Sequence, residues 1–314
     1  MYGNKETKRS YEYLQKVVSA LEEPICLLGG WAIFLTMNKN YKSNIGRDYL
    51  GSRDIDLGFH LEEGKDFSKS SFVRSMKKLE EEGFKEVGGR MVKELDFDTG
   101  KELSKEEAQA KPIFDIHKMF VDLMVDYIPK SLDEKSSKLL LDETLLEYVF
   151  ANGENRVELE EFSKKLWLPK SWVLLAMKTK SLPGRQKEDK RKKDIADIAA
   201  ILLFAREETA PPRMFEALRK DKILQSLKGI TQAEIKETES LLGVQPNSFN
   251  AALSETIRQV EQTFKGKVKK IISNEKIVQV ARNHSVAEIK NEIPGLKIGD
   301  FILCTDFETI RKIQ

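Results

Sequence analysis

The sequence predicts an α+β protein with three consecutive parts, and three observations lead to that fold class. In residues 1–130, helical and strand-like segments alternate. In residues 131–263, the apolar residues follow an almost entirely helical pattern. In residues 264–314, short strand candidates surround the turn sequence PGLKIGD, which predicts a small β-rich module. The 314 residues suffice for two or three domains, and a hydrophobic content of 40% supports globular cores.

The segments of the first part are defined by their periodicity and their stop signals. Leu14, Val17 and Leu21 recur at helical spacing, and Gly83 is typical of a helix end. The expected elements are a helix over 7–22, a strand over 25–30, a helix over 31–38, a polar loop over 39–52, a strand over 53–61, a helix over 66–83, a strand pair with a central Gly-Gly turn over 84–98, a loop or short helix over 99–111, and a strand over 113–128.

Composition excludes several classes of protein. The 53 basic and 51 acidic residues give a net charge of +2, so phosphate or nucleic-acid binding must come from local basic clusters. Cys26 and Cys304 lie in apolar surroundings without paired or metal-type spacing, which predicts buried free thiols. The sequence shows no apolar core of a signal peptide and no run long enough to span a membrane. We therefore expect a soluble, cytoplasmic protein without a membrane partner.

Two aspartates interrupt the strand sequence SRDIDLGF at residues 52–59. Asp54 and Asp56 are two residues apart, so a strand places both on one face, opposite Ile55 and Leu57. Like charges held side by side repel one another unless a cation lies between them or the face is fully hydrated. The apolar opposite face argues against a solvated edge strand, and carboxylate oxygens are the ligands that Mg²⁺ prefers.

A glycine pair and a third acid extend this pattern. Gly29 and Gly30 lie between a predicted strand and a helix, where they either form a structural turn or let the backbone approach a phosphate. The strand over 113–128 contains Asp122, and a carboxylate in a buried strand is costly unless it is paired, protonated or metal-bound. Asp126 competes for this role, but it lies near the end of the strand. Three carboxylates on neighbouring strands beside a glycine turn predict a two-metal site for phosphoryl chemistry.

These motifs resemble those of the nucleotidyltransferases of the DNA polymerase β superfamily. LLGGWAIFL (27–35) followed by SRDIDLGF matches their pattern of a Gly-Gly turn, an Asp-x-Asp strand and a third acid on a later strand. The Gly-Gly-Trp-Ala form is similar to the antibiotic nucleotidyltransferases. LLAMKTKSLPGRQKEDKRKKDIADIAAIL (174–202) resembles the Lys…Arg…Lys-Asp-x-x-Asp stretch of the abortive-infection toxin nucleotidyltransferases. The resemblance covers residues 10–205.

The resemblance implies a fold, a reaction and a set of site residues. It implies a nucleotidyltransferase-type mixed β-sheet with flanking helices over 1–130, followed by the helical part and the β-rich module. It also implies transfer of a nucleoside monophosphate from a nucleoside triphosphate to a hydroxyl group. The implied metal ligands and catalytic residues are Asp54, Asp56 and Asp122, which would hold two Mg²⁺ ions, and the implied substrate-binding residues are Gly29, Gly30, Lys178, Lys193 and Asp194.

The sequence departs from the superfamily pattern in two places. Trp31 follows the glycines where the superfamily usually has Ser or Thr, which removes a hydroxyl from the phosphate site. The 23 residues from 31 to 53 exceed the usual span between the glycines and the first aspartate. In the polar loop that fills this gap, Lys39, Lys42 and Arg47 are candidates to face phosphates.

The basic segment around Lys193 leaves two interpretations open. Most of its charges are expected in a solvated loop. Lys178 lies on an otherwise apolar helix, so its ammonium either extends to the surface or reaches a triphosphate. Asp194 and Asp197 are three residues apart on one helix surface, and ion pairs with Lys178, Lys190 or Lys193 are their conservative role.

The leading functional hypothesis is a Mg²⁺-dependent nucleotidyltransferase, and two alternatives accompany it. One is a non-catalytic nucleic-acid-binding protein on the same fold, with the C-terminal module as an RNA-binding barrel. The other is the toxin of a toxin–antitoxin pair, a biological role for the same chemistry. His60, His117 and His284 show no metal-ligand spacing, although His117 lies in the strand that leads to Asp122. The sequence leaves open the triphosphate, the acceptor (RNA, protein or small molecule) and the oligomeric state.

Overall fold

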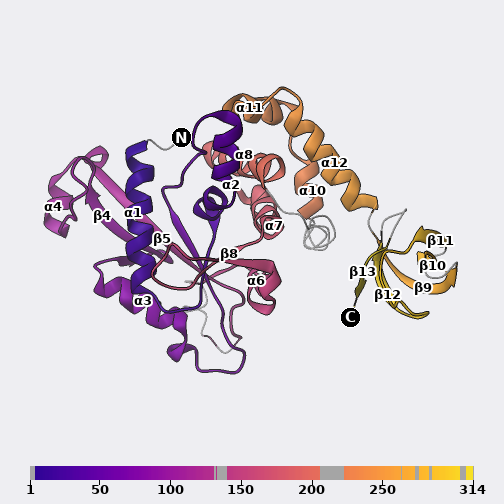
Figure 1. Cartoon of the computed structure of the whole chain (residues 1–314). Helices are drawn as coiled ribbons and strands as arrows, with labels where there is room; N and C mark the ends of the chain where they lie inside the picture. Colours follow the sequence, from indigo (N-terminus) through magenta and orange to yellow (C-terminus); the bar gives the residue numbers. More distant parts are fainter. Residues whose placement is uncertain are drawn as a thin grey trace. The chain divides into compact units, whose positions relative to one another are not determined.

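The structure is a computed structural model that forms two compact units. The first comprises Met1–Lys178 with Gln186–Ala205, and the second comprises Thr179–Arg185 with Arg206–Gln314. The first contains a mixed β-sheet with helices, and the second contains helices and a separate, curled antiparallel sheet (Figure 1). The residues described are 4–130, 132, 140–205, 223–262, 264–272, 276–282, 285–304 and 309–313.

The sheet of the first unit has eight strands among the described residues. Their order is β3-β4-β5-β2-β1-β8-β7, and β6 pairs with β5. The pairs β2–β5, β1–β8 and β5–β6 are parallel and the others antiparallel, so the sheet is mixed. The strands are β1 Ile25–Leu27, β2 Ile55–Phe59, β3 Lys85–Val87, β4 Arg90–Asp96, β5 Ile116–Val125, β6 Leu141–Asp142, β7 Arg156–Leu159 and β8 Leu166–Pro169.

The helices of this part of the chain pack on both faces of the sheet. On one face of β2, Phe59 packs against Phe72 of α3, with ring centroids 5.8 Å apart. On the other face, Gly58 lies directly under Leu146 of α6. Helices α1 and α3 lie side by side (Figure 1). The helices are α1 Asn4–Ala20, α2 Gly29–Ile45, α3 Ser71–Glu81, α4 Lys105–Ala110, α6 Leu146–Ala151, α7 Ser171–Ser181 and α8 Glu188–Phe204, with short 3₁₀ turns at Phe67–Lys69, Ile113–Asp115, Gly153–Asn155 and Leu182–Gly184.

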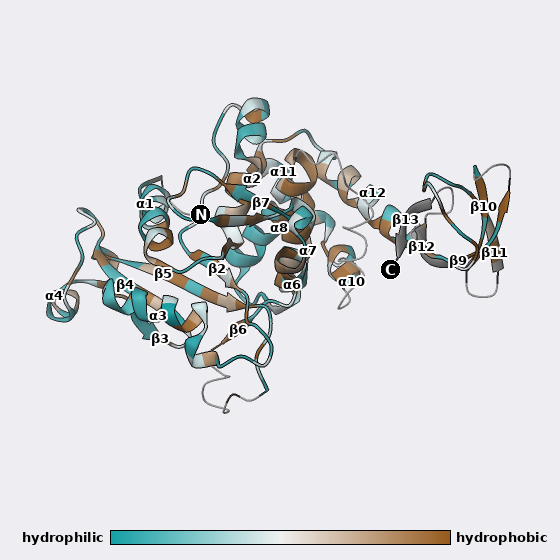
Figure 2. Cartoon of the chain, turned by 60° about the horizontal axis from the view of Figure 1, so that its bottom comes forward, coloured by the Kyte–Doolittle hydropathy of each residue, from teal (hydrophilic) through white to brown (hydrophobic). Residues whose placement is uncertain are grey.

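The predicted order of elements up to residue 130 is confirmed, with one shift of boundary. Helix α2 continues to Ile45 through residues that were expected in the polar loop, and it ends at Gly46 in the left-handed conformation. The predicted Gly-Gly turn joins β3 to β4, and both of its glycines have positive φ. Strand β5 is largely hydrophobic and the short helix α4 is hydrophilic, which agrees with their buried and exposed positions (Figure 2).

The prediction that residues 131–263 are almost entirely helical is wrong. Strands β7 and β8 lie in this segment, and β8 pairs in parallel with β1 at the centre of the first sheet. Four-residue strands are too short for a period of two to stand out against neighbouring helices. The first sheet therefore draws on residues beyond 130, while the predicted boundaries at 130 and 263 stay predictions.

The second unit contains the predicted β-rich module. Its antiparallel sheet has the strand order β11-β10-β9-β12-β13, with β9 Phe264–Ile272, β10 Ile277–Arg282, β11 Ser285–Lys290, β12 Phe301–Cys304 and β13 Thr309–Ile313. One hydrophobic core cluster belongs to this module and includes Val268, Val280 and Ile302. The described helices of this unit are α10 Ile223–Lys228, α11 Gln232–Leu242 and α12 Ser248–Gln262.

Two smaller expectations also meet the structure. Cys26 and Cys304 are both free and buried, as predicted. Within the described residues, none of the helices combines the length and the apolar character that a bilayer crossing needs. His284 lies outside the described residues.

Candidate functional site

The pairing of β2 with β5 brings two of the predicted acids together. Asp56 is directly opposite Asp122 in the parallel register of these strands. Side chains at paired positions share one face of a sheet, so both carboxylates lie on the face that carries α6. The predicted adjacency of Asp122 to the Asp-x-Asp strand is thereby confirmed. Its role, and that of Asp54 and Asp56, stays a prediction.

Asp54 precedes β2, and a chain of hydrogen bonds fixes the backbone around it. The Ser52 hydroxyl donates to the carbonyl oxygen of Asp54 at 2.9 Å. The Ser10 hydroxyl of α1 donates to the carbonyl oxygen of Arg53, also at 2.9 Å. Trp31 Nε1 in turn donates to the Ser10 oxygen at 2.9 Å. Trp31 is therefore directed toward α1, where it holds the segment that carries Asp54.

Gly29 and Gly30 make room for the acidic strand and for the segment before it. Gly29 has a φ of 61°, and a Cβ at this position would lie 1.8 Å from Asp56 Oδ2 and 3.0 Å from Asp56 Cβ. A Cβ on Gly30 would lie 2.9 Å from Ser52 Cβ. The Leu28 N–H donates to the Asp56 carbonyl oxygen at 2.8 Å, which completes the junction of β1, α2 and β2. No side chain caps the N-terminus of α2 at Leu28, and Gly29, the first residue of this helix, lies against Asp56.

A guanidinium group bridges the acids. Arg90, the first residue of β4, donates from Nε to Asp122 Oδ1 at 2.5 Å and from Nη2 to Asp122 Oδ2 at 2.8 Å. The same Nη2 donates to Asp54 Oδ2 at 3.1 Å. The Phe120 ring supports the guanidinium from one side, 4.2 Å from ring centroid to Cζ. A positive charge thus occupies the position between Asp54 and Asp122.

Arg90 does not remove the repulsion among the three carboxylates. Burial, followed by repulsion from Asp122 and Asp54, raises the pKa of Asp56 to about 7, while Lys178 and Arg90 oppose the shift. Asp54 Oδ1 is buried and accepts no hydrogen bond from the described residues, and its contact with Arg53 Nε is 3.7 Å long. The site therefore combines a carboxyl group that releases its proton less readily than an ordinary aspartate with a buried carboxylate oxygen that accepts no hydrogen bond from the described residues.

The donor set suits a hard cation, but the side chains are not arranged around one. Carboxylate oxygens are the preferred ligands of Mg²⁺, and Asp54 Oδ1 has unsatisfied acceptor capacity. Within the described part of the chain, however, no group of three histidine, cysteine, aspartate or glutamate side chains is positioned to hold a metal ion. Arg90 takes that place, so metal binding would require the guanidinium to leave.

The Lys-Asp-x-x-Asp motif forms a buried ion-pair network between α7 and α8. Lys178 Nζ lies 2.8 Å from Asp194 Oδ1 and 2.9 Å from Asp197 Oδ2, and Lys193 Nζ lies 2.5 Å from Asp197 Oδ1. Desolvation lowers the pKa of Lys178, but the two aspartates outweigh it and raise that pKa overall. Desolvation dominates at Lys193 and lowers its pKa. The expected ion pairs are confirmed, while substrate contacts of Lys178, Lys193 and Asp194 stay predictions.

This network connects to the loop that precedes Asp54. Tyr49 is buried and donates its hydroxyl hydrogen to Asp197 Oδ1 at 2.7 Å, while Lys193 Nζ lies 5.0 Å from the centre of its ring. A pocket of about 360 Å³ opens beside this loop. Its lining residues are Glu6, Leu50, Gly51, Arg53, Asp189, Lys192 and Lys193. A cavity lined by three basic side chains therefore adjoins the segment that holds Asp54.

Two of the three basic candidates from the predicted polar loop, Lys42 and Arg47, have partners close by in the chain. Lys42 Nζ lies 3.1 Å from Asp48 Oδ2, and Arg47 bonds the Tyr41 hydroxyl. Asn38 also donates to Asp48, at 2.9 Å. These contacts give the loop a structural role, and phosphate contacts of its basic side chains stay predictions.

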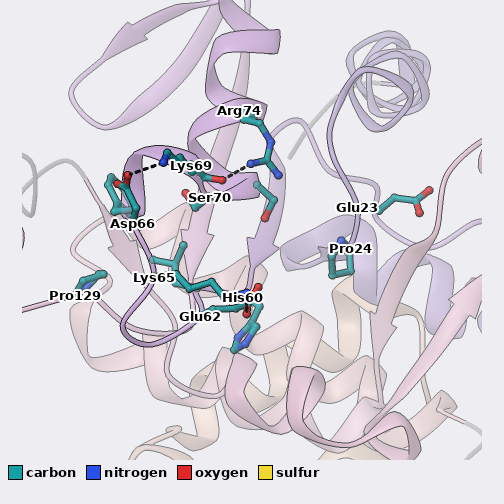
Figure 3. Close-up of a pocket in the computed structure, with 13 residues that line it drawn as sticks. Glu23, Pro24, His60, Glu62, Lys65, Asp66, Lys69, Ser70, Arg74 and Pro129 are labelled. Carbon is teal, nitrogen blue, oxygen red and sulfur yellow. Dashed lines mark hydrogen bonds and ion pairs between the residues drawn. The ribbon is translucent and has the colours of Figure 1, made fainter.

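A second polar pocket lies farther along β2 and has a different character. His60 Nδ1 contacts Asp126 Oδ2, and the Leu61 N–H donates to Asp126 Oδ1 at 3.0 Å. The pocket has a volume of about 460 Å³, with His60 and Lys65 on one wall and Lys69 on another (Figure 3). Asp126 is therefore engaged with His60, four residues beyond Asp122, and does not join the acids around Arg90.

The other described histidine lies on the opposite face of the sheet from Asp122. His117 is buried on β5, five positions before Asp122, and an odd spacing along a strand places two side chains on opposite faces. Burial lowers the pKa of His117, and its Nε2 has no hydrogen-bond partner among the described residues. His117 is thus a core residue.

Sequence reasoning missed Arg90, Tyr49 and the hydrogen bond of Trp31. Arg90 directly follows a Gly-Gly turn in a predicted hairpin, but only the pairing of β4 with β5 reveals that it faces Asp122. Tyr49 was hidden in a loop without periodicity. A buried tryptophan needs a partner for its N–H, which is the one signal that points toward a hydroxyl such as that of Ser10.

Comparisons with known proteins do not establish a family. Neither the protein-family models nor the curated proteins contain a match to this chain. Among solved structures, the crystal structure of an antigenic nucleotidyltransferase-like protein from Paracoccidioides brasiliensis is similar, with 15% sequence identity and a TM-score of 0.38. The match covers 78% of this chain and 95% of that chain. Similarity at this level establishes neither a shared activity nor the predicted superfamily.

The contact between Gly29 and Asp56 gives a first prediction. Gly29→Ala should lower the free energy of unfolding by at least about 2 kcal/mol more than Gly46→Ala does, as measured by urea denaturation. Both glycines have a positive φ, but a Cβ on Gly46 meets no atom within 4 Å. The backbone cost is therefore shared, and the excess reports the collision with Asp56. Equal losses in the two variants would show that Asp56 moves freely.

The raised pKa of Asp56 gives a second prediction. The ordinary pKa of an aspartate is 3.8, and that of Asp56 in the folded protein is about 7. Between these two pH values, the folded protein binds a proton on Asp56 that the unfolded chain releases. The free energy of unfolding should therefore fall across this pH window in the wild type, by on the order of 2–4 kcal/mol relative to Asp56→Asn. Asp98→Asn, at an exposed carboxylate, should keep the wild-type profile. If the free energy of unfolding depended on pH in the same way in the wild type and in Asp56→Asn, the raised pKa of Asp56 would be contradicted.

Proposed function

We propose that this protein is a Mg²⁺-dependent nucleotidyltransferase that moves a nucleoside monophosphate from a nucleoside triphosphate to a hydroxyl group. The observation that carries the proposal is the cation position between Asp54 and Asp122, which Arg90 fills, beside Asp56, whose pKa is raised. Carboxylates held together at such cost are typical of sites that bind metal and phosphate. The resemblance of the Gly-Gly and Asp-x-Asp motifs supports the same reaction class.

Asp54, Asp56 and Asp122 would hold the metal ions once Arg90 has withdrawn. Bound Mg²⁺ would neutralise charge on the triphosphate and on the leaving pyrophosphate. In the transfer, the acceptor oxygen forms a bond to the α-phosphorus and the bond from that phosphorus to the pyrophosphate oxygen breaks. The carboxylate of Asp122 takes the proton of the acceptor hydroxyl. These residues act mainly by positioning and charge neutralisation.

The triphosphate would bind between the N-terminus of α2 and the pocket beside Asp54. Gly29 and Gly30 let the backbone approach a ligand at the positive end of a 17-residue helix. Arg53, Lys192 and Lys193 line the neighbouring pocket. Its volume of about 360 Å³ lies within the ordinary range for small-ligand sites.

Lys178 and Asp194 would influence the ionisation of the acids. Lys178 lowers the pKa of Asp56, so its positive charge is felt at the acidic face. Asp194 and Asp197 hold the Lys178 ammonium in place, with 14% of the lysine side chain exposed. The network thereby favours the ionised form of Asp56, which is the form that binds a metal ion.

The acceptor and the cellular setting are less constrained than the chemistry. An RNA, a protein and a small molecule all offer hydroxyl groups, and a toxin role is compatible with each. We place the reaction in the cytoplasm because both cysteines are free thiols. A retired site used only for binding nucleic acid is the second candidate, and the absence of a preformed metal cluster among the described residues favours it.

Transfer itself tests the proposal. The protein, Mg²⁺ and total RNA are incubated with each α-labelled triphosphate in turn, and the label is followed into RNA, protein and small molecules. Asp54→Asn and Asp122→Asn should reduce transfer by at least about 100-fold, since each removes a ligand of the proposed metals. Asp126→Asn should retain transfer, because Asp126 contacts His60 instead. Wild-type protein that transfers no label, or Asp122→Asn that transfers normally, would contradict the proposal.

Arg90 gives a separate test that needs no acceptor. Arg90→Met should raise the affinity for Mn²⁺ by about tenfold, or about 1.4 kcal/mol, because the guanidinium no longer competes for the carboxylates. The measurement is titration of the free ion by electron paramagnetic resonance. Arg74→Met removes an arginine that pairs with Glu22, away from the acids, and should leave Mn²⁺ affinity unchanged. Unchanged or weaker binding in Arg90→Met would show that Arg90 does not stand in for the cation.

A further inference from the structure

One face of the C-terminal sheet carries a row of side chains across four strands. Val286 on β11 pairs with Ala281 on β10, Ala281 pairs with Lys267 on β9, and Lys267 pairs with Phe301 on β12. Paired residues point to the same face, so these four side chains form one row, which we call the outer face. Strands β10 and β11 contain hydrophobic segments (Figure 2).

The outer face is not the core face of the module. The core cluster includes Val268, Ile302 and Val280, each of which directly neighbours a residue of the row along its strand. Alternation along a strand then places the core on the other side. Phe301 is 55% exposed and Val286 is 57% exposed, so large apolar groups remain accessible on the outer face.

Three exposed lysines lie on β9, and one of them is beside the Phe301 ring. Lys267 Nζ lies 5.5 Å from the centre of the Phe301 ring. Lys269 and Lys270, also on β9, are exposed. Glu288 on β11 also lies on the outer face and accepts a hydrogen bond from Gln279 at 2.8 Å, so one acid lies among these lysines.

Charge is distributed unevenly along the chain. Residues 264–314 contain ten lysines and arginines against six aspartates and glutamates, whereas the other residues contain 43 against 45. A basic strand beside an exposed aromatic ring complements a polyanion with stackable bases. A protein partner would meet the same apolar groups, but it offers no row of bases to stack on the exposed ring.

We propose that the outer face binds single-stranded polynucleotide. A base stacks on Phe301, Lys267, Lys269 and Lys270 contact phosphates, and Val286, at the far end of the row, contacts a base or sugar farther along the strand. Duplexes fit less well because their bases are stacked internally and cannot reach the ring. This inference holds whether or not the proposed nucleotide transfer occurs, since it uses none of the acids around Arg90.

Fluorescence anisotropy of the full chain tests the inference. Labelled single-stranded RNA and DNA of about 12 nucleotides, and the matching duplexes, are titrated at about 50 mM salt without triphosphate or Mg²⁺. The single strands should bind more tightly than the duplexes. The RNA and DNA arms show whether the sugar matters. Asp54→Asn should bind as the wild type does, which separates this result from that of the transfer assay.

Matched variants locate the binding surface. Phe301→Ala should weaken single-strand binding by about tenfold or more, because a stacking platform is lost. Lys267→Gln should reduce the slope of log affinity against log salt by about 0.7, the value for one phosphate contact. Phe114→Ala and Lys105→Gln, exposed positions in the first unit, should change neither quantity. Absence of single-strand binding, or equal effects of the control variants, would overturn the inference, and absence of binding would leave the outer face to a protein partner.

Discussion

The first unit depends on keeping several carboxylates together on one face of a sheet. Asp56 and Asp122 are fixed by strand register, and Asp54 is fixed by the segment that leads into β2. Strand pairing keeps the backbone of Asp56 and Asp122 in place, so the repulsion is compensated locally. The guanidinium of Arg90 bridges Asp54 and Asp122, and the positive charge of Lys178 lowers the pKa of Asp56.

Several residues around the carboxylates hold them in this arrangement. Only glycine fits at position 29, because the Asp56 side chain occupies the space that a Cβ would need. Trp31 is committed to Ser10, which in turn holds the carbonyl of Arg53. The tryptophan therefore has a structural role, because its contact with Ser10 orders the acidic segment.

The network around Lys178 shows the same principle at a second position. A lysine on an apolar helix is stable only when its ammonium finds acceptors, and Asp194 and Asp197 supply them from α8. Tyr49 extends the network to the loop before Asp54. Helix α8 and the acidic strand are thus coupled through side chains that are almost fully buried.

The sequence allowed the acids to be predicted better than their partners. The period of two fixes Asp54 and Asp56 on one face, and a buried carboxylate at Asp122 stands out in an apolar strand. Arg90 could not be found in this way, because its position depends on a pairing between β4 and β5 that no local pattern specifies. Strands β7 and β8 were missed for a related reason: short strands are stabilised by the sheet that they join and carry little periodicity of their own.

Charge balance constrains how such a site can work under the proposed function. Arg90 and a metal ion cannot share the space between Asp54 and Asp122, so one must leave when the other arrives. A triphosphate brings negative charge along with its metal, and a guanidinium released from the carboxylates is a suitable partner for it. In such an exchange Asp54 and Asp122 would hold the metal ion and Arg90 would pair with a phosphate, so each charge would stay paired. The tight bidentate contact of Arg90 with Asp122 is therefore compatible with a working site, because the substrate itself supplies both replacements.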